Sequence, residues 1–298
     1  MTNIFLFGSS TKTGQFIEVN YKSFFEDSQI YSFSRKKSSN SYFDLTSFII
    51  PDNLPLNQEF IIISLAPIWL FVPYLEWLLE RKKVNKKLIL GIITTSSTSI
   101  ITKKYSWNKF DSNLYKKLSF WEKKLKKLNK RFDLGISLIR PTLIYADIGK
   151  NSDKNISILM KMMRKLLLLP LPNNTGLRQP IHFSQLGKSI LNISKSYKVY
   201  KYKKRSLKII NIGGDEELTY QEMLKRIKKS FPKSDRINNC IFLKIPNRLF
   251  FIICMPTLIF SPKLFEAIQR ITINMSGFTK SYKISGSKKQ KFPVKYNN

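Results

Sequence analysis

Short apolar runs alternate with helical segments through the first half of this 298-residue chain, and this alternation limits the folds that are open to it. Continuous apolar runs of this length are typical of parallel strands that are buried on both faces. The runs are Asn3–Phe7, Gln29–Phe33, Phe60–Ser64, Leu88–Ile93 and Leu134–Ile139. A helical segment at about Leu70–Arg81 lies between two of them. The pattern of strand, helix and strand predicts an α/β fold with a doubly wound parallel sheet.

The clearest helix of the chain is predicted over Asp111–Arg131. Four leucines and Trp121 recur there at steps of three and four residues and form one apolar stripe, while lysines occupy the other faces. This run of charge is therefore interpreted as a solvated helix surface.

The second half is less regular. We expect a helix over Asn155–Leu169 that stops at Pro170, a loop over Gly176–Phe183, and a short helix through Leu191 that Ser184 caps. The remaining elements are a strand over Lys208–Ile212, a helix over Tyr220–Ser230 with a capping box from Thr219 and Glu222, helical stretches at Pro246–Ile259 and Pro262–Ile273, and a loose basic tail.

The chain is strongly basic, with 52 Lys and Arg against 19 Asp and Glu and a formal net charge of +33. The basic residues are spread from Lys12 to Lys295 and do not gather around aromatic residues or Gly/Arg motifs, which argues against nucleic acid as a partner. Abundant Lys, Asn and Ile with little Ala is the composition expected from an AT-rich genome. An anionic ligand or an anionic membrane surface remains an alternative explanation of the charge.

Several features of the sequence bear on the cellular compartment in which the protein is expected. A hydrophobic content of 43% is ample for a buried core and excludes wholesale disorder. Cys240 and Cys254 make neither a disulfide framework nor a zinc site, so no metal is expected. The first residues, MTNIFLFGSS, have no basic region ahead of the apolar run, and the apolar stretch Leu249–Phe260 is too short to span a bilayer. A cytoplasmic protein is expected, with peripheral membrane association as the alternative.

A turn rich in small residues follows the first predicted strand. It has the sequence Gly8-Ser-Ser-Thr-Lys-Thr-Gly14 and leads into a helix over Gln15–Val19. Small residues at such a junction let backbone N–H groups approach a pyrophosphate, which the helix N-terminus also favours. We predict that Gly8, Ser10, Thr11 and Gly14 contact a dinucleotide. Thr11 stands where the usual fingerprint has its middle glycine, and a plain tight turn is the alternative.

The second predicted strand ends in Ser34-Arg35-Lys36-Lys37. An acidic residue at this place would bind the adenosine ribose of NAD, whereas a basic cluster suits the 2′-phosphate of NADP. Arg35 is therefore predicted to bind cofactor, and NADP is favoured over NAD. An exposed basic turn is the ordinary explanation in so basic a chain.

Taken together, these segments resemble the extended short-chain dehydrogenase/reductase superfamily, and within it the NAD(P)-dependent nucleoside-diphosphate-sugar epimerases and dehydratases. The matching motifs are FLFGSSTKTG at 5–14, FDL at 43–45, IITTSSTS at 92–99, LIRPTLIY at 138–145, GLRQPIHFSQL at 176–186 and INIGGDEELTYQE at 210–222. The resemblance implies a Rossmann-type domain over 1–147 and a smaller substrate-binding lobe over 148–298, interleaved with the first. It also implies that Asp44, Leu45 and Pro141 lie against the cofactor.

The chemistry that the resemblance implies is transient hydride transfer on a nucleotide sugar, as in an epimerase, dehydratase or reductase. The family uses a Ser or Thr hydroxyl and a Tyr-x-x-x-Lys pair to handle the proton. Ser96, Ser97 or Thr98 matches the hydroxyl, and we favour Ser97 and Thr98.

The Tyr-x-x-x-Lys pair has no single match. Tyr105 and Lys109 fit the motif literally, but an alignment on Glu122 puts Leu114 and Leu118 at its positions. Three hypotheses stay open. Tyr105 and Lys109 are a working pair, or Lys103, Tyr115 or Tyr145 is a nonstandard base, or the chain binds cofactor without the standard chemistry.

The resemblance also implies substrate-binding residues. Arg178 would bind a diphosphate, and His182, the single histidine, would lie near the sugar nucleotide. Asn155 and Arg140 are further candidates by family position. A surface arginine, a buried structural histidine, and packing or capping roles are the respective alternatives.

The function that follows is an NAD(P)-dependent enzyme of nucleotide sugars, and the rival is a redox-inactive NADP-binding regulatory or assembly protein. The expected partner is a nucleotide sugar or a related small molecule. A homodimer and contact with an anionic membrane are left open.

Overall fold

A seven-stranded parallel sheet forms the centre of the molecule in the computed structural model, which describes residues 2–35, 42–51, 54–148, 154–200 and 206–294. The strand order is β13–β10–β5–β4–β3–β1–β2. The strands are β1 (Asn3–Phe7), β2 (Ile30–Phe33), β3 (Phe60–Ser64), β4 (Ile89–Thr95), β5 (Ile136–Pro141), β10 (Leu207–Gly213) and β13 (Thr279–Lys280). The predicted doubly wound α/β fold is confirmed.

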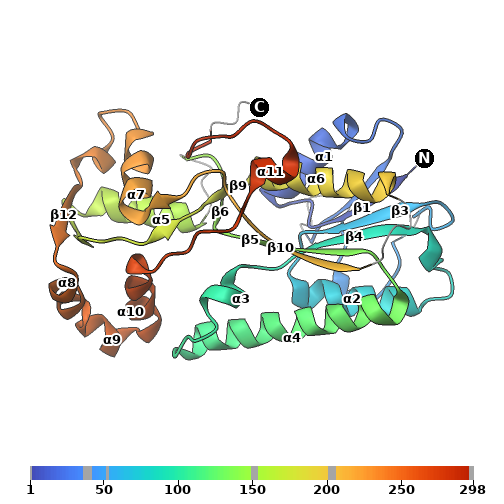
Figure 1. Ribbon diagram of the computed structural model, residues 1–298, viewed down its shortest axis with the longest axis horizontal. Coiled ribbons are helices and arrows are strands. Elements are labelled where there is room, and N and C mark those ends of the chain that lie inside the picture. Colours follow the sequence, from blue (N-terminus) through green and yellow to red (C-terminus); the bar gives the residue numbers. More distant parts are fainter. Residues whose placement is uncertain (1, 36–41, 52–53, 149–153, 201–205, 295–298) are drawn as a thin grey trace.

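Helices cover both faces of this sheet (Figure 1). On one face lie α1 (Lys12–Asn20), α6 (Phe183–Val199) and α11 (Ser281–Ser285), and on the other lie α2 (Ile68–Glu80) and α4 (Lys109–Phe132). Successive side chains of a strand point to opposite faces, so Ile4 and Leu6 of β1 pack with α1 and α6 while Phe5 and Phe7 pack with α2 and α4. Both faces are therefore buried at the centre of the sheet, which is why β1 and β3 are largely apolar.

A smaller lobe beside the sheet has its own core (Figure 1). Its helices are α5 (Lys154–Lys165), α7 (Tyr220–Lys229), α8 (Asn247–Cys254), α9 (Pro256–Phe260) and α10 (Pro262–Gln269). Its strand pairs are β7 (Leu168–Pro172) with β12 (Ile241–Ile245), and β8 (Leu177–Arg178) with β11 (Leu218–Thr219). Met160 and Met163 of α5 pack against Met223 and Leu224 of α7 in this core.

Short elements connect the two parts of the molecule. They are α3 (Ser99–Thr102) and the strand pair β6 (Ile144–Tyr145) and β9 (Ile181–His182). The 3-10 helices η1 (Tyr21–Ser23), η2 (Leu45–Ser47) and η3 (Lys86–Leu88) lie within the sheet domain, and η4 (Arg236–Asn239) and η5 (Arg270–Thr272) follow elements of the lobe. The chain crosses between sheet and lobe more than once, because α6, β10, β13 and α11 all return to the sheet.

Two predictions around Pro170 and Gly176 are wrong. The helix that begins at Lys154 ends at Lys165, and Leu168–Pro172 is a strand paired with β12. A residue before proline disfavours the helical conformation, and the edge of a two-stranded sheet tolerates proline. The predicted loop over Gly176–Phe183 contains β8 and β9, and α6 runs to Val199 with His182, not Ser184, as its N-cap.

The expected loose tail is also wrong for residues 279–294. Asp215, a buried carboxylate, accepts hydrogen bonds from the backbone N–H groups of Tyr282 and Gln290 at 2.9 Å each. The backbone N–H of Val294 donates to the hydroxyl of Tyr145 at 3.0 Å. These bonds fix the segment because a buried carboxylate left without donors would be costly.

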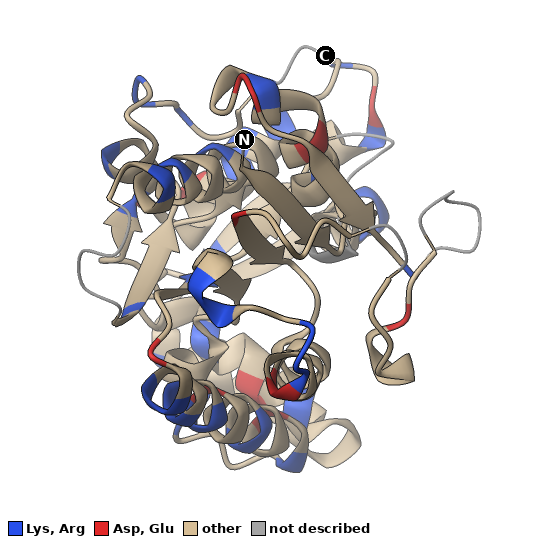
Figure 2. Ribbon diagram, turned by 90° about the vertical axis from the view of Figure 1, so that its right-hand side faces the viewer, with Lys and Arg blue, Asp and Glu red and all other residues tan. Residues whose placement is uncertain are grey.

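Lysine and arginine recur along the helices on the face shown in Figure 2, with few acidic residues between them. On α4 the lysines lie outside a buried stripe that includes Leu118, Leu125 and Leu128, as predicted. Among the described helices, none combines the length and the apolar character needed to cross a bilayer.

Candidate cofactor and substrate site

The turn between β1 and α1 is built around two glycines. Gly8 has φ 88°, in the left-handed region that favours glycine. A Cβ on Gly14 would lie 2.6 Å from the carbonyl oxygen of Gly8 and 2.7 Å from the Cα of Ser9. The first turn of α1 therefore lies directly against the backbone that follows β1, at the carboxyl edge of the sheet.

Thr11 is accommodated in this turn as a helix cap. Its hydroxyl donates to the carbonyl of Gly8 at 2.9 Å and accepts the N–H of Gly14 at 3.0 Å. The hydroxyl of Thr11 thus makes both hydrogen bonds within the turn, although the residue stands where the fingerprint has glycine. Ser10 and Thr11 are both exposed.

The adenine end of the predicted site is only partly described. Arg35 is exposed just after β2, and Lys36 and Lys37 lie outside the described residues. Asp44 accepts hydrogen bonds from the backbone N–H and the hydroxyl of Thr46, both at 2.9 Å, and these bonds lower the pKa of its carboxyl. The neighbouring Leu45 is buried.

Two cavities lie at the carboxyl edge of the sheet. The first, which we call the turn cavity, has a volume of about 260 Å³ and is lined by Thr11–Thr13 together with Thr95, Tyr145 and Leu186. The second, the lobe cavity, has a volume of about 440 Å³ and is lined by Ser96–Ser99, Lys103, Arg178 and Arg270. Ile144 lines both. The two cavities are therefore neighbours, one at the glycine turn and one between the sheet and the lobe.

The three hydroxyl residues after β4 have different environments. Ser96 donates to a carboxylate oxygen of Glu122 at 2.6 Å, and Arg140 also binds Glu122 through its Nε, at 3.1 Å, and through a terminal nitrogen. Thr98 is buried and donates to the carbonyl of Pro141 at 3.1 Å. Ser97 lines the lobe cavity, and its hydroxyl lies 3.0 Å from that of Ser99.

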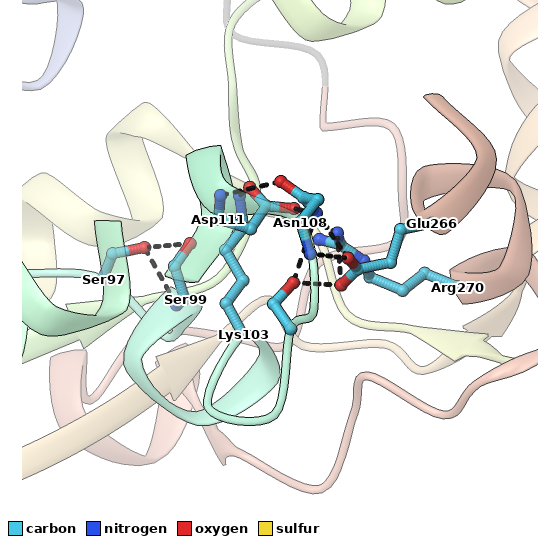
Figure 3. Close-up of polar contacts among 8 residues, drawn as sticks. Ser97, Ser99, Lys103, Asn108, Asp111, Glu266 and Arg270 are labelled. Atoms are coloured by element: carbon cyan, nitrogen blue, oxygen red, sulfur yellow. Dashed lines mark hydrogen bonds and ion pairs between the residues drawn. The ribbon is translucent and has the colours of Figure 1, made fainter. Parts of the chain in front are cut away.

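A compact ionic cluster closes one wall of the lobe cavity (Figure 3). Asp111 binds Lys103 and Arg270, and Arg270 also donates to Glu266 at 3.1 Å. Asn108 donates to Asp111 at 3.2 Å and also binds Glu266. Burial acts to raise the pKa of Asp111, but hydrogen bonds from Lys103, Arg270 and Asn108 lower it to about 2. The cluster joins the start of α4 to α10.

The candidate tyrosines lie apart from this wall. Tyr105 is 86% exposed in the turn after α3, while Lys109 is the first residue of α4, so the two do not share a helix. Tyr115 is half-buried on α4. Tyr145 lines the turn cavity, and burial raises the pKa of its hydroxyl. None of these three lines the lobe cavity.

The alignment on Glu122 puts Leu114 and Leu118 at the positions of the Tyr-x-x-x-Lys pair, and both side chains pack in the core. Leu118 is buried in the core between the sheet and α4, and Leu114 packs against the same core.

Arg178 lines the lobe cavity but has several protein partners. Its guanidinium donates to the carbonyls of Leu177 and Ile273 at 2.8 and 2.7 Å, and lies over the ring of Tyr220 at 5.3 Å. Burial lowers the pKa of Arg178. The backbone of Asn155 lies in α5, and its side chain is outside the described part of the chain.

His182 is fully buried at the start of α6. Its Nδ1 lies 2.7 Å from the hydroxyl of Ser184, and Gln185 completes a capping box by accepting the backbone N–H of His182. The Nε2 lies 3.5 Å from Asp147. Burial lowers the pKa of His182 from 6.5 to about 4, against the opposing effect of Asp147.

This histidine predicts a pH dependence of stability. Between pH 6.5 and 4 the unfolded chain binds a proton that the folded chain does not, so stability falls as the pH falls. We expect a loss of about 3 kcal/mol across this window. His182→Asn keeps a good N-cap and should flatten the dependence. Urea unfolding at a series of pH values measures it, and equal slopes in the two proteins would contradict the assignment.

Sequence reasoning missed most of the ionic cluster. Lys103 is among the candidate bases, but Asp111, Glu266 and Arg270 have no predicted role at the site. A usable signal existed in Asn108 and Asp111, because an Asn three residues before an Asp is typical of a capped helix start. Glu266 and Arg270 lie 155 or more residues after Asp111, and no local pattern connects them to α4.

Comparisons with known proteins rest on structure, since neither a family profile nor a curated protein sequence matches the chain. It is similar to UDP-glucuronic acid 4-epimerase from Bacillus cereus in complex with NAD, with a TM-score of 0.57 and 12% identity over 97% of this chain and 94% of that one. It is also similar to a nucleoside-diphosphate-sugar epimerase from Staphylococcus aureus, with a TM-score of 0.56 and 12% identity over 97% of each chain.

A third similar structure is UDP-N-acetylglucosamine 4-epimerase from Bacillus cereus, with a TM-score of 0.55 and 16% identity over 82% of this chain and 86% of that one. Identities this low establish the fold alone. The chain therefore has the Rossmann-type α/β fold seen in these nucleotide-sugar epimerases.

Proposed function

We propose that the protein binds NAD(P) at the β1–α1 turn and acts on a nucleotide sugar as an epimerase, dehydratase or reductase. The observation that carries the proposal is the turn itself, where the space beside Gly14 is too small for a Cβ and the turn opens onto a cavity. This tight turn brings the N-terminus of α1 to the cavity, where backbone N–H groups can bind a pyrophosphate. The similar structures include complexes with NAD, UDP-glucose and UDP-glucuronic acid, which supports these ligand classes.

We assign the cofactor to the β1–α1 turn and the sugar nucleotide to the lobe cavity. The exposed Ser10 and Thr11 would contact the pyrophosphate, Gly8 and Gly14 would shape the turn that presents them, and Arg35 would lie near the adenosine ribose. The lobe cavity would hold the sugar nucleotide. A bound nicotinamide supplies hydride transfer to and from a sugar carbon. The protein must then supply a group that exchanges a proton with the sugar hydroxyl.

Lys103 and Ser97 are our candidates for that proton exchange. Both side chains line the lobe cavity, and Lys103 is the single lysine among the described residues that line it. Its ion pair with Asp111 fixes the ammonium at the wall of the lobe cavity, where it could donate a proton to a developing alkoxide in the reductive direction. Tyr105 and Lys109 remain a prediction, with the exposure of Tyr105 as the observation against them.

Variants of Lys103 separate these hypotheses. Lys103→Arg keeps the ion pair with Asp111 but offers a group that does not release its proton, so turnover should fall by about 100-fold or more. Ser97→Ala should also reduce turnover, while Tyr105→Phe should leave it unchanged. Chromatographic separation of the products formed from UDP-glucose or UDP-glucuronic acid in the presence of NAD(P) measures turnover. A large loss in Tyr105→Phe with an active Lys103→Arg would favour the Tyr105 pair instead.

The cofactor proposal is tested by titrating the protein with NADPH and NADH and following nicotinamide fluorescence. We expect NADPH to bind more tightly, because Arg35 can pair with a 2′-phosphate. Arg35→Ser should remove most of that preference and leave NADH binding unchanged. Binding of neither dinucleotide would refute the proposal, whereas binding without turnover on any nucleotide sugar would indicate a redox-inactive regulator.

Two finer proposals concern partners. Self-association as a homodimer stays a prediction. The net charge of +33 supports contact of a cytoplasmic protein with an anionic membrane.

A further inference from the structure

Large apolar side chains are exposed together on three consecutive helices of the lobe. Helices α8, α9 and α10 contact one another, and seven of the 16 residues from 249 to 264 are large, apolar and exposed. They are Leu249, Ile252, Ile253, Met255, Ile259, Phe260 and Leu264. Single exposed apolar residues are ordinary, but a concentration of them marks an interaction surface.

Three exposed aromatic residues adjoin these helices. Tyr105, Trp107 and Phe110 lie between α3 and the first turn of α4. Glu266 of α10 binds Ser106 and accepts the backbone N–H of Asn108 at 3.3 Å, and the ammonium of Lys263 lies 3.5 Å from the ring centre of Phe110. We call the seven apolar residues and these three aromatics the docking surface.

The charge of the docking surface has one sign. No Asp or Glu occurs in residues 97–110 or 236–265, whereas Lys104, Lys109, Arg248 and Lys263 are exposed there. The acidic residues at its border, Asp111 and Glu266, are buried in the ionic cluster. The surface therefore combines aliphatic side chains, Trp and Tyr, and cations without counter-charges.

We propose that the docking surface binds an anionic lipid bilayer, lying on it rather than crossing it. Aliphatic groups can enter the boundary of the acyl chains, Trp and Tyr favour the interface, and Lys and Arg attract anionic headgroups. A second copy of the chain would bring two like-charged surfaces together with no acidic residue between them. This inference deepens the proposed membrane contact and is independent of the proposed chemistry.

The test is co-sedimentation of the full chain with vesicles of phosphatidylcholine, alone or mixed with phosphatidylserine. Binding should require phosphatidylserine and should weaken in high salt. I259S/F260S, which changes residues 83% and 86% exposed, should lower the vesicle partition coefficient by about tenfold or more. V19S/V199S changes exposed residues of α1 and α6 and should leave it unchanged.

A charge pair controls for the overall net charge. K104E/K263E should abolish most of the binding, whereas K123E/K127E, with the same charge change on the exposed part of α4, should retain most of it. Equal losses of vesicle binding in the two double variants would mean that net charge alone drives the binding, and would contradict the proposed docking surface. So would absence of binding, or equal binding to neutral vesicles.

Sedimentation velocity without lipid tests the rival occupant. A dimer that I259S/F260S dissociates, together with unchanged vesicle binding, would assign the surface to a second copy. NADPH titration of the same variants keeps the two proposals apart, because the docking surface lies outside the turn cavity and cofactor binding should be unaffected.

Discussion

Gly14→Ala is expected to abolish measurable binding of both NADPH and NADH. The added Cβ would lie within 2.8 Å of the carbonyl oxygens of Gly8 and Ser9, and these are backbone atoms that cannot rotate away. Either α1 moves off the turn or the turn changes shape, and overpacking of this kind costs typically about 1–3 kcal/mol. Nicotinamide fluorescence measures the binding, and thermal unfolding measures the cost to the fold.

Gln15→Ala is the matched control, because Gln15 is the next residue of α1 and is exposed. It should change neither binding nor the unfolding temperature. A folded Gly14→Ala variant that binds dinucleotide as well as the unsubstituted protein would show that the turn is not the cofactor site.

Asp111→Ala is expected to destabilise the protein by about 3 kcal/mol, because the largely buried Lys103 loses its carboxylate partner and Arg270 keeps only Glu266. The loss should be present at neutral pH. It should shrink as the pH falls toward 2, since the carboxyl of Asp111 is then protonated in the unsubstituted protein. Urea unfolding at several pH values measures the difference.

Glu80→Gln provides the comparison. Glu80 pairs with Arg131 at 3.0 Å, and both side chains are substantially exposed, so its loss should cost less than about 1 kcal/mol. A cost for Asp111→Ala as small as that for Glu80→Gln would mean that the ionic cluster does not hold α10 against α4.

The sheet was predictable because each of its central strands is buried on both faces. Asn3–Phe7 and Phe60–Ser64 were predicted with the bounds that the structure shows, since a continuous apolar run between polar neighbours has few other uses. Around Pro170 the same reasoning failed. Leu166–Leu169 fits either a helix or a strand, and the choice depends on β12, which lies about 70 residues further along the chain.

The candidate site was predictable where its parts are local and not where they are distant. The glycine turn is contained in seven consecutive residues. The wall of the lobe cavity needs Arg270 beside Lys103, and that proximity follows only from how the lobe lies against the sheet. The scarcity of acidic residues made Asp111 and Glu266 informative, but nothing local pairs them with particular cations.

The docking of residues 279–285 at the edge of the sheet has a consequence for the order of events during synthesis. β13 pairs with β10, and α11 packs on α6, so the last strand of the sheet is made after the lobe that interrupts the chain. The carboxyl end of β10, at Ile212 and Gly213, therefore lacks its pairing partner until β13 at residues 279–280 has been synthesised. An exposed edge is a template for pairing with other chains. We expect pairing of this edge with other chains to compete with folding during this interval.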